Sequence, residues 1–598
     1  MPLYKELPVD LNEVDVIIAG GGTAGCIIAA RLSDADPSLS ILIIESGVHS
    51  EDDSTTKYPL LFLIHMDPTS KFMKGAMSQP SEQLGGRGLA IAHGNVLGGG
   101  STVNMMTYSR PYRFDFGTWD MPGWQSEDVI PYFKKFEKYH GPGKDDVHGK
   151  DGPIEVSDGS MVIQRTQDDF IAASNKVGIP LRDDVQDFEN AIGVQRNLQY
   201  VSPNGERQGV ANKYIMPRLE DENHSGLHVV VSTRVEKVLF DENKRAVGVV
   251  CRATSEGSKP REVKAKRQVV LSAGTFGSPT ILQRSGIGSA ELLNKAGVPL
   301  VVENSGVGEN FQEHLLNLTA YHSDLKPEET MDALHLGKYD VPAAVANNDP
   351  FLGWTGMDTI CQIRPTDDEV AALGDDFKEK FSKYWGSEPN KVMGALCALN
   401  SYPGVIPPEL HGQQYFGTTA FATYPFSRGY IHITGPNDTD PIDFKTGFFE
   451  DEGNFDIKTM RYLYKTQREI VRRMSLYQGE VAILHPAFPA GSSAGVHSGP
   501  LTGEIKNLEY TKEDDDAIDE WVRKTVGTAW HGIGSCKMGR REKGGVVDGE
   551  LNVYGVEGLK VADLSVVGGN VAANTNSTAL MIGEKAADIV IKDLGRRL

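Results

Sequence analysis

The sequence predicts an α/β protein with two parts: a Rossmann-like domain on a parallel sheet, assembled from separate stretches of chain, and an α+β domain on an antiparallel sheet. Three observations predict it. Residues 14–19 are a short β-branched run that leads into a glycine-rich turn and a helix. Residues 267–274 repeat the pattern of a strand that enters a glycine turn. Residues 321–515 contain alternating strands such as 429–434 and helical stretches such as 455–473, as α+β layers do.

The first glycine turn has the spacing G-x-G-x-x-G, formed by Gly20, Gly22 and Gly25 between the strand and the helix. Gly20 permits a tight turn, Gly22 lets a pyrophosphate approach the backbone, and Gly25 lets the helix pack closely on the strand. In this context the motif predicts a dinucleotide-binding site.

The residues around this turn support the same prediction. Thr23 and Ala24 open the helix, whose N-terminal N–H groups attract phosphate. A second strand at 40–44 ends at Glu45, which lies 20 residues after Gly25, where an acid that binds a ribose is expected. These features do not choose between NAD and FAD.

The composition is that of a globular protein and excludes two classes of partner. The 598 residues carry 60 Lys plus Arg and 81 Asp plus Glu, a formal charge of −21. We therefore expect neither nucleic-acid binding nor a polybasic membrane anchor. The longest apolar stretch, 14–32, is interrupted by Asp15 and by glycines, which argues against a membrane span. The five cysteines are widely spaced and the charged N-terminus lacks the apolar stretch of a signal peptide, so we expect an intracellular protein.

Four segments resemble sequences shared by the glucose–methanol–choline (GMC) flavin oxidoreductases. They are residues 94–116, which begin Gly-Asn-Val-Leu-Gly-Gly-Gly-Ser, 274–288, 306–314 and 552–587. In the third segment Glu313 stands where the family usually has Asp. The resemblance spans almost the whole chain in order and implies FAD as the cofactor. Beyond the first turn, it implies a set of FAD-binding residues: Leu97, Gly99, Ser101, Asn104, Met106, Val235, Asp563 and Thr575.

Within the family, the chain is most similar to the fungal and yeast alcohol oxidases, through residues 96–101, 424–434 and 529–536. Two features differ. Met105 stands where those enzymes usually have Phe, and the chain is shorter than they are, including at the C-terminus where oligomer contacts are made. We expect Met105 and Trp530 to shape the substrate pocket, with plain core packing as the alternative for each, and we expect alcohols larger than methanol to be accepted. Whether the chain forms a homo-oligomer stays open.

His531 is the expected catalytic base and Asn574 its partner. Oxidising an alcohol removes a hydride from carbon and a proton from oxygen, and a base must take that proton. A neutral imidazole suits this task near physiological pH. The resemblance implies that both side chains face the flavin ring. Asn574 cannot titrate, so it would orient the hydroxyl and stabilise negative charge on its oxygen. The alternatives are an ordinary core histidine and a turn asparagine.

The flavin motifs are separated in sequence, so the predicted FAD-binding domain is discontinuous. We expect it to contain residues 1–158, 208–320 and 516–598, and we expect a substrate-binding domain from residues 159–207 and 321–515, with an antiparallel sheet over the flavin.

The resemblance implies oxidation of a primary alcohol to an aldehyde, with hydride transfer to the flavin and O2 as the electron acceptor that yields hydrogen peroxide. The alternatives are a dehydrogenase of the same family that uses another acceptor, a flavin-containing lyase and a non-catalytic flavoprotein. No metal site is predicted. Cytoplasm and peroxisome both stay open, because the chain ends in Arg-Arg-Leu598 and lacks the small residue of an S-K-L-type signal.

Overall fold

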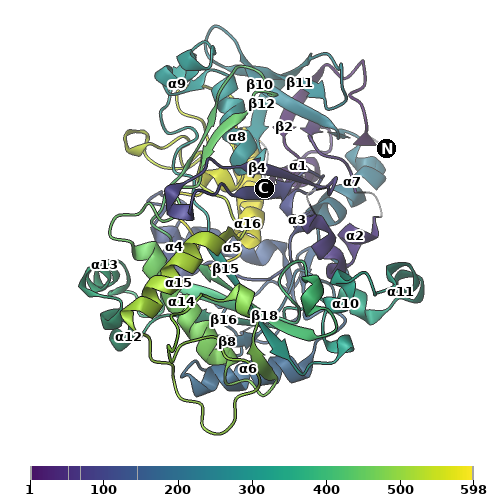
Figure 1. Ribbon diagram of the computed structural model, residues 1–598. Coiled ribbons are helices and arrows are strands. Elements are labelled where there is room, and N and C mark those ends of the chain that lie inside the picture. Colours follow the sequence, from purple (N-terminus) through teal and green to yellow (C-terminus); the bar gives the residue numbers. More distant parts are fainter. Residues whose placement is uncertain (1–2, 51–52, 68, 145, 596–598) are drawn as a thin grey trace.

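Two sheets form the framework of the molecule in the computed structural model, which describes residues 3–50, 53–67, 69–144 and 146–595. An eight-stranded sheet occupies the upper half of Figure 1, a seven-stranded sheet occupies the lower half, and the C-terminal helix α16 (Asn576–Asp593) lies near the centre. Within these ranges, no helix combines the length and the apolar character needed to cross a membrane. The C-terminal tripeptide that bears on peroxisomal targeting lies outside the described residues.

The eight-stranded sheet is parallel over most of its width, which confirms the predicted Rossmann-like domain. Its central strands are β-branched and almost fully buried, as strands covered on both faces are. Two antiparallel strands extend one side of it. In order, its strands are β1 (Leu3–Tyr4), β9 (Leu227–Val230), β3 (Ile41–Ile44), β2 (Glu13–Ala19), β12 (Arg261–Leu271), β11 (Ala246–Ala253) and β10 (Thr233–Phe240), with β23 (Leu559–Val561) also paired to β12.

Helix α1 (Thr23–Ala35) follows β2 directly and packs against α16. It begins at Thr23 because Gly22, in extended conformation, is its N-cap. Two glycines allow the close packing. A Cβ on Gly25 would lie 2.2 Å from the Gly20 carbonyl oxygen, and a Cβ on Gly583 would lie 3.1 Å from the Cα of Ala24. The third glycine of the turn thus has the packing role that the sequence predicts.

The seven-stranded sheet is antiparallel, and one of its faces packs on a helix while the other lines a cavity. Phe416 and Thr418 face α14 (Phe455–Val471), and Thr418 Oγ1 donates a hydrogen bond to Gln467 on that helix at 3.0 Å. Thr419 and Phe421 alternate with them and line a cavity. In order, the strands are β21 (Tyr477–Glu480), β15 (Leu315–Ser323), β18 (Gln414–Ala422), β17 (Gly394–Leu399), β16 (Thr359–Ile363) and β8 (Gly193–Arg196), with β22 (Gly527–Thr528) also paired to β15.

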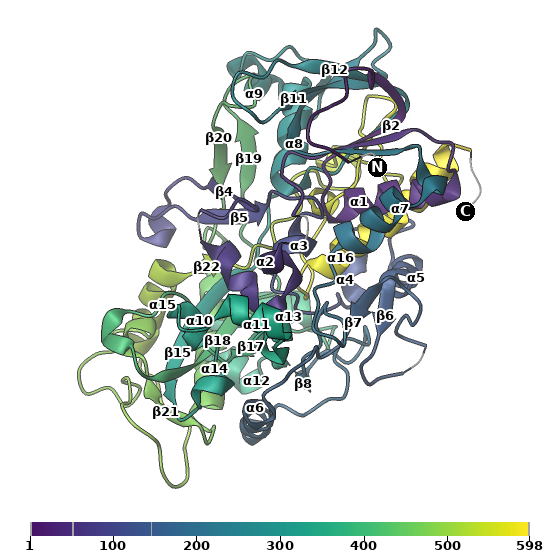
Figure 2. The same ribbon diagram turned by 90° about the vertical axis from the view of Figure 1, so that its right-hand side faces the viewer.

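Some elements differ in place or extent from the sequence expectation. The strand expected at 429–434 is β19 (Tyr430–Ile433), which pairs with β20 (Ile442–Lys445) and does not belong to the seven-stranded sheet. It packs on α8 (Gly274–Arg284), where Gln283 Oε1 accepts a hydrogen bond from Ile433 N at 2.9 Å. Figure 2 shows β19 and β20 beside α8. The proposed domain boundaries therefore stay a prediction.

Replacing Gly25 by Ala tests the close approach of helix and strand. The new Cβ meets backbone, which cannot rotate away, so we expect the free energy of unfolding to fall by about 1–3 kcal/mol. Gly117→Ala is the matched control, because a Cβ there meets nothing within 4 Å and the backbone φ is ordinary. Urea unfolding followed by circular dichroism measures both. Equal stability of the two variants would contradict the packing role of Gly25.

Candidate active site

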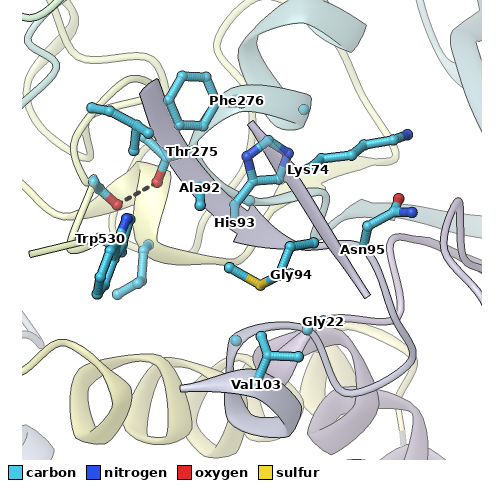
Figure 3. Close-up of a pocket in the computed structure, with 18 of the residues that line it drawn as sticks. Gly22, Lys74, Ala92, His93, Gly94, Asn95, Val103, Thr275, Phe276 and Trp530 are labelled. Carbon is cyan, nitrogen blue, oxygen red and sulfur yellow. Dashed lines mark hydrogen bonds between the residues drawn. The ribbon is translucent and has the colours of Figure 1, made fainter. Parts of the chain in front are cut away.

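A cavity of about 840 Å³ lies where the two sheets approach each other. Ala19, Ile44 and Ser272, at or just beyond the carboxyl ends of β2, β3 and β12, form one wall, and this is where α/β sheets bind ligands. Figure 3 shows that the hairpin of β4 (Met73–Met77) and β5 (Ala90–Gly94) faces Gly22 and Val103 across the cavity. Thr419 and Phe421 on β18 line the cavity from the side of the seven-stranded sheet.

Two glycine turns that are far apart in sequence meet on this wall. Gly20 has φ +107°, and a Cβ there would lie 2.4 Å from Ser272 O. Gly99 has φ +53°, and its Cβ would lie 2.9 Å from Gly22 Cα. Thr23 Oγ1 donates a hydrogen bond to Gly98 O at 3.3 Å. The N-cap residue of α1 is Gly22, which has no side chain to cap the helix N-terminus. The turns therefore leave an open cradle that suits a diphosphate at a helix N-terminus.

Charged groups flank the cradle. The Glu45 carboxylate accepts hydrogen bonds from Gly21 N at 2.8 Å and Gly47 N at 2.6 Å, and burial raises its pKa. Its role as a ribose ligand stays a prediction. Lys74 on β4 also lines the cavity, and burial lowers its pKa (Figure 3). Lys74 stands in no sequence motif and was not predicted, and its ammonium group suits an anionic ligand.

The structure brings most of the predicted site residues to this one cavity, and three lie behind its wall. The Leu97 side chain packs against Gly21 and would lie 2.8 Å from a Cβ added there. Gly25 lies in the contact between helix and strand. The Ser101 hydroxyl donates a hydrogen bond to Gly98 O at 2.8 Å. The predicted residues on the wall are Gly20, Gly22, Thr23, Ala24, Glu45, Gly99, Asn104, Met105, Met106, Val235, Trp530, His531, Asp563, Asn574 and Thr575.

A bulge in the pairing of two chain segments positions His531. β22 pairs with the start of β15, and Gln312 and Ile533 form a second bridge beyond it. Four residues, 529–532, thus face two residues, 313–314. Trp530 in the bulge has φ +57°, which a bulky aromatic residue adopts only when its surroundings require it.

Glu313 holds this bulge together from the opposite segment. Its carboxylate accepts hydrogen bonds from His531 N at 2.8 and 3.0 Å, from His314 N at 2.8 Å and from Thr528 Oγ1 at 3.0 Å. Burial raises its pKa to about 7. In the sequence Glu313 is visible only as a departure from the usual Asp, because the partners that define its role lie more than 200 positions away.

The side chains of His531 and Asn574 lie together, as the sequence analysis expects. His531 Nε2 is 3.2 Å from Asn574 Nδ2. Ser109 orients the amide, because its hydroxyl accepts from Asn574 N at 2.7 Å and donates to Asn574 Oδ1 at 3.0 Å. On its other side, His531 Nδ1 is 2.8 Å from Nδ1 of His314. Burial lowers the pKa of His531 well below the ordinary value, so the ring is neutral.

His314 was not predicted from the sequence, although it ends one of the four segments that carry the family resemblance.

Among the described residues, no group of three or more His, Cys, Asp and Glu side chains could hold a metal ion. The cavity volume, the glycine cradle and the uncapped helix N-terminus together fit a flavin dinucleotide.

Comparison with known proteins agrees with this geometry. The model of the GMC oxidoreductase N-terminal part matches residues 14–316, and that of the C-terminal part matches residues 425–583. An alcohol oxidase of Pichia angusta is 36% identical over 98% of this chain and 96% of its own length, and one of Candida boidinii is 35% identical over the same shares. A solved FAD-dependent oxidoreductase of Chaetomium thermophilum, 24% identical, superposes with a TM-score of 0.80 over 98% of this chain and 100% of that one. The chain therefore belongs to the GMC oxidoreductase family, and FAD is its cofactor.

Proposed function

We propose that this protein oxidises small primary alcohols to aldehydes and that O2 is the final electron acceptor, so that hydrogen peroxide is released. The observation that carries the proposal is the pair of His531 Nε2 and Asn574 Nδ2, 3.2 Å apart on the wall of the cavity that contains the glycine cradle. Relatives named alcohol oxidases, 35–36% identical over nearly the whole chain, support the same substrate class.

The two side chains suit the two demands of alcohol oxidation. Bound FAD supplies the acceptor for the hydride. The neutral His531 ring offers a base for the hydroxyl proton. An Asn574 N–H can donate to the alcohol oxygen and stabilise the negative charge that develops there. General-base catalysis of this kind contributes about 10²–10⁴-fold in rate.

Apolar residues on the wall of the same cavity favour a small apolar substrate. Met105, Trp530, Phe421 and Leu316 line the cavity with His531. Carbon and sulfur surfaces accept an alkyl chain without leaving polar groups unpaired. Met105 is more flexible than a phenyl ring, so chains longer than methanol are expected to fit.

A panel of alcohols from methanol to butanol tests the proposal, with oxygen uptake and peroxide measured together in the FAD-loaded enzyme. We expect equal amounts of oxygen consumed and peroxide formed, and faster turnover of an alcohol longer than methanol. Flavin reduction by the alcohol without peroxide would instead indicate a dehydrogenase. Absence of flavin reduction by any alcohol would contradict the proposal.

Replacing His531 by Ala is expected to keep FAD bound, because the glycine cradle is untouched, and to slow flavin reduction by about 10²–10⁴-fold. Anaerobic stopped-flow spectroscopy measures the reduction rate, and the absorbance of the washed protein measures bound FAD. His411→Ala, an exposed histidine outside the cavity, is the control. If His531→Ala reduced its flavin as fast as the control, the assigned base would be wrong.

The pH dependence of flavin reduction tests the state of the ring. Two titratable groups face His531: the Glu313 carboxylate, which holds its backbone N–H, and the His314 ring, whose pKa burial lowers to about 4. Because the pKa of His531 lies well below the ordinary value, the ring stays a competent base as the pH falls through about 6.5. The Glu313 carboxyl, with a pKa of about 7, gains its proton in this range, but it contacts the backbone N–H of His531 and not the ring. We therefore expect no tenfold loss of the limiting rate per pH unit between about pH 8 and about pH 6. A rate that halves near pH 6.5 and falls tenfold per unit below it would contradict this.

A further inference from the structure

His314 is a fully buried histidine whose ring contacts the ring of His531. It directly precedes β15, its ring stacks on Phe421 at a centroid distance of 5.0 Å, and it meets the His531 ring edge-on at 5.0 Å. Both of its nitrogens have partners. Those partners determine where its single hydrogen must be.

The Nε2 atom of His314 lies 3.1 Å from Thr423 O and 3.0 Å from Val571 O. Carbonyl oxygens only accept hydrogen bonds, so Nε2 carries the hydrogen. Burial lowers the pKa of His314 to about 4, so the ring is neutral and has one hydrogen. Its Nδ1 atom is therefore unprotonated and can only accept.

This assignment determines the hydrogen on His531 in turn. The two Nδ1 atoms are 2.8 Å apart, and a contact this short needs one hydrogen between them. Since His314 cannot provide it, His531 Nδ1 donates. The neutral His531 ring then has an unprotonated Nε2, which faces Asn574 Nδ2 and the cavity. In the opposite tautomer two lone pairs would face each other at 2.8 Å, and Nε2–H would face an amide donor.

We propose that His314 is a positioning residue that sets the tautomer of His531, so that the unprotonated Nε2 is the atom presented to the alcohol. The inference rests on the proposed role of His531 as the base. When Nε2 takes the hydroxyl proton, His531 Nδ1–H still has its acceptor, and His314 stabilises the imidazolium without taking part in the transfer. The hydrogen on His314 Nε2 faces the Thr423 and Val571 carbonyl oxygens, which do not take a proton, so the transferred proton remains on His531.

The first test reads the tautomers directly in the FAD-loaded wild-type enzyme, labelled with 15N-histidine. Nitrogen NMR distinguishes protonated from unprotonated ring nitrogens, and the signals that disappear in His314→Gln and His531→Asn assign the two rings. We expect protonation at Nδ1 of His531 and at Nε2 of His314. The reverse pattern in either ring overturns the proposal, and this result does not depend on which substrate the enzyme oxidises.

The second test compares two replacements of His314. A Gln carboxamide can donate to Thr423 O and Val571 O and accept from His531 Nδ1–H, whereas Phe keeps a flat ring on Phe421 and offers no acceptor. We expect His314→Gln to reduce flavin within about tenfold of the wild-type rate and His314→Phe to lose at least about 100-fold, with hydrogen appearing on His531 Nε2.

Two results of this comparison would overturn the proposal. One is a wild-type rate in His314→Phe. The other is an equal loss in both variants with the hydrogen still on His531 Nδ1, since that pattern indicates a packing role alone. If His314→Phe does not fold, the wild-type spectrum and the rate of His314→Gln decide the question.

Discussion

The pairing of β22 with the start of β15, tied by the Glu313 carboxylate, is the constraint on which the rest of the site depends. One segment leads from the Rossmann-like part into the seven-stranded sheet, and the other returns from helix α15 (Lys512–Thr525). The buried carboxylate accepts hydrogen bonds from two backbone N–H groups and one hydroxyl. Leaving one such donor unsatisfied costs about 1–3 kcal/mol. The hydrogen bonds to the buried Glu313 carboxylate, and not the strand propensity of these residues, therefore hold the bulge that presents His531.

Surroundings, and not residue type, distinguish the proposed base, His531, from the other buried histidines. His148 lies between two carboxylates, with Asp184 at 2.9 Å, in a closed ion-pair network. His485 bonds to Tyr464 and to a backbone carbonyl, away from the cavity. In the part of the chain that the structure describes, no carboxylate contacts the His531 ring, so burial keeps the ring neutral, and its Nε2 lies beside Asn574 at the cavity wall. A neutral ring with an unprotonated nitrogen at the cavity wall is what proton abstraction needs.

The sequence predicted those parts of the site whose geometry is encoded locally. Gly20 has a positive φ and Gly25 has a close approach that only glycine allows, so the spacing, together with the strand before it and the helix after it, identifies the turn. His531 and Asn574 were found through motifs. The role of His314 could not be predicted, because its partners lie 217, 109 and 257 positions away. The separate β19–β20 pair was missed for a related reason: strand alternation shows that a strand exists, but not which sheet it joins.

The strained backbone of Trp530 explains how two neighbouring side chains serve one cavity. In a regular strand, adjacent residues point to opposite faces, so Trp530 and His531 could not both line the same space. A left-handed residue breaks that alternation, and both side chains reach the cavity wall. The strain costs about 1–3 kcal/mol. The bonds from Trp530 N to Thr528 Oγ1 at 2.8 Å and from His531 N to Glu313 offset it. The bulge thus places the Trp530 ring and the proposed base on the same side of the chain.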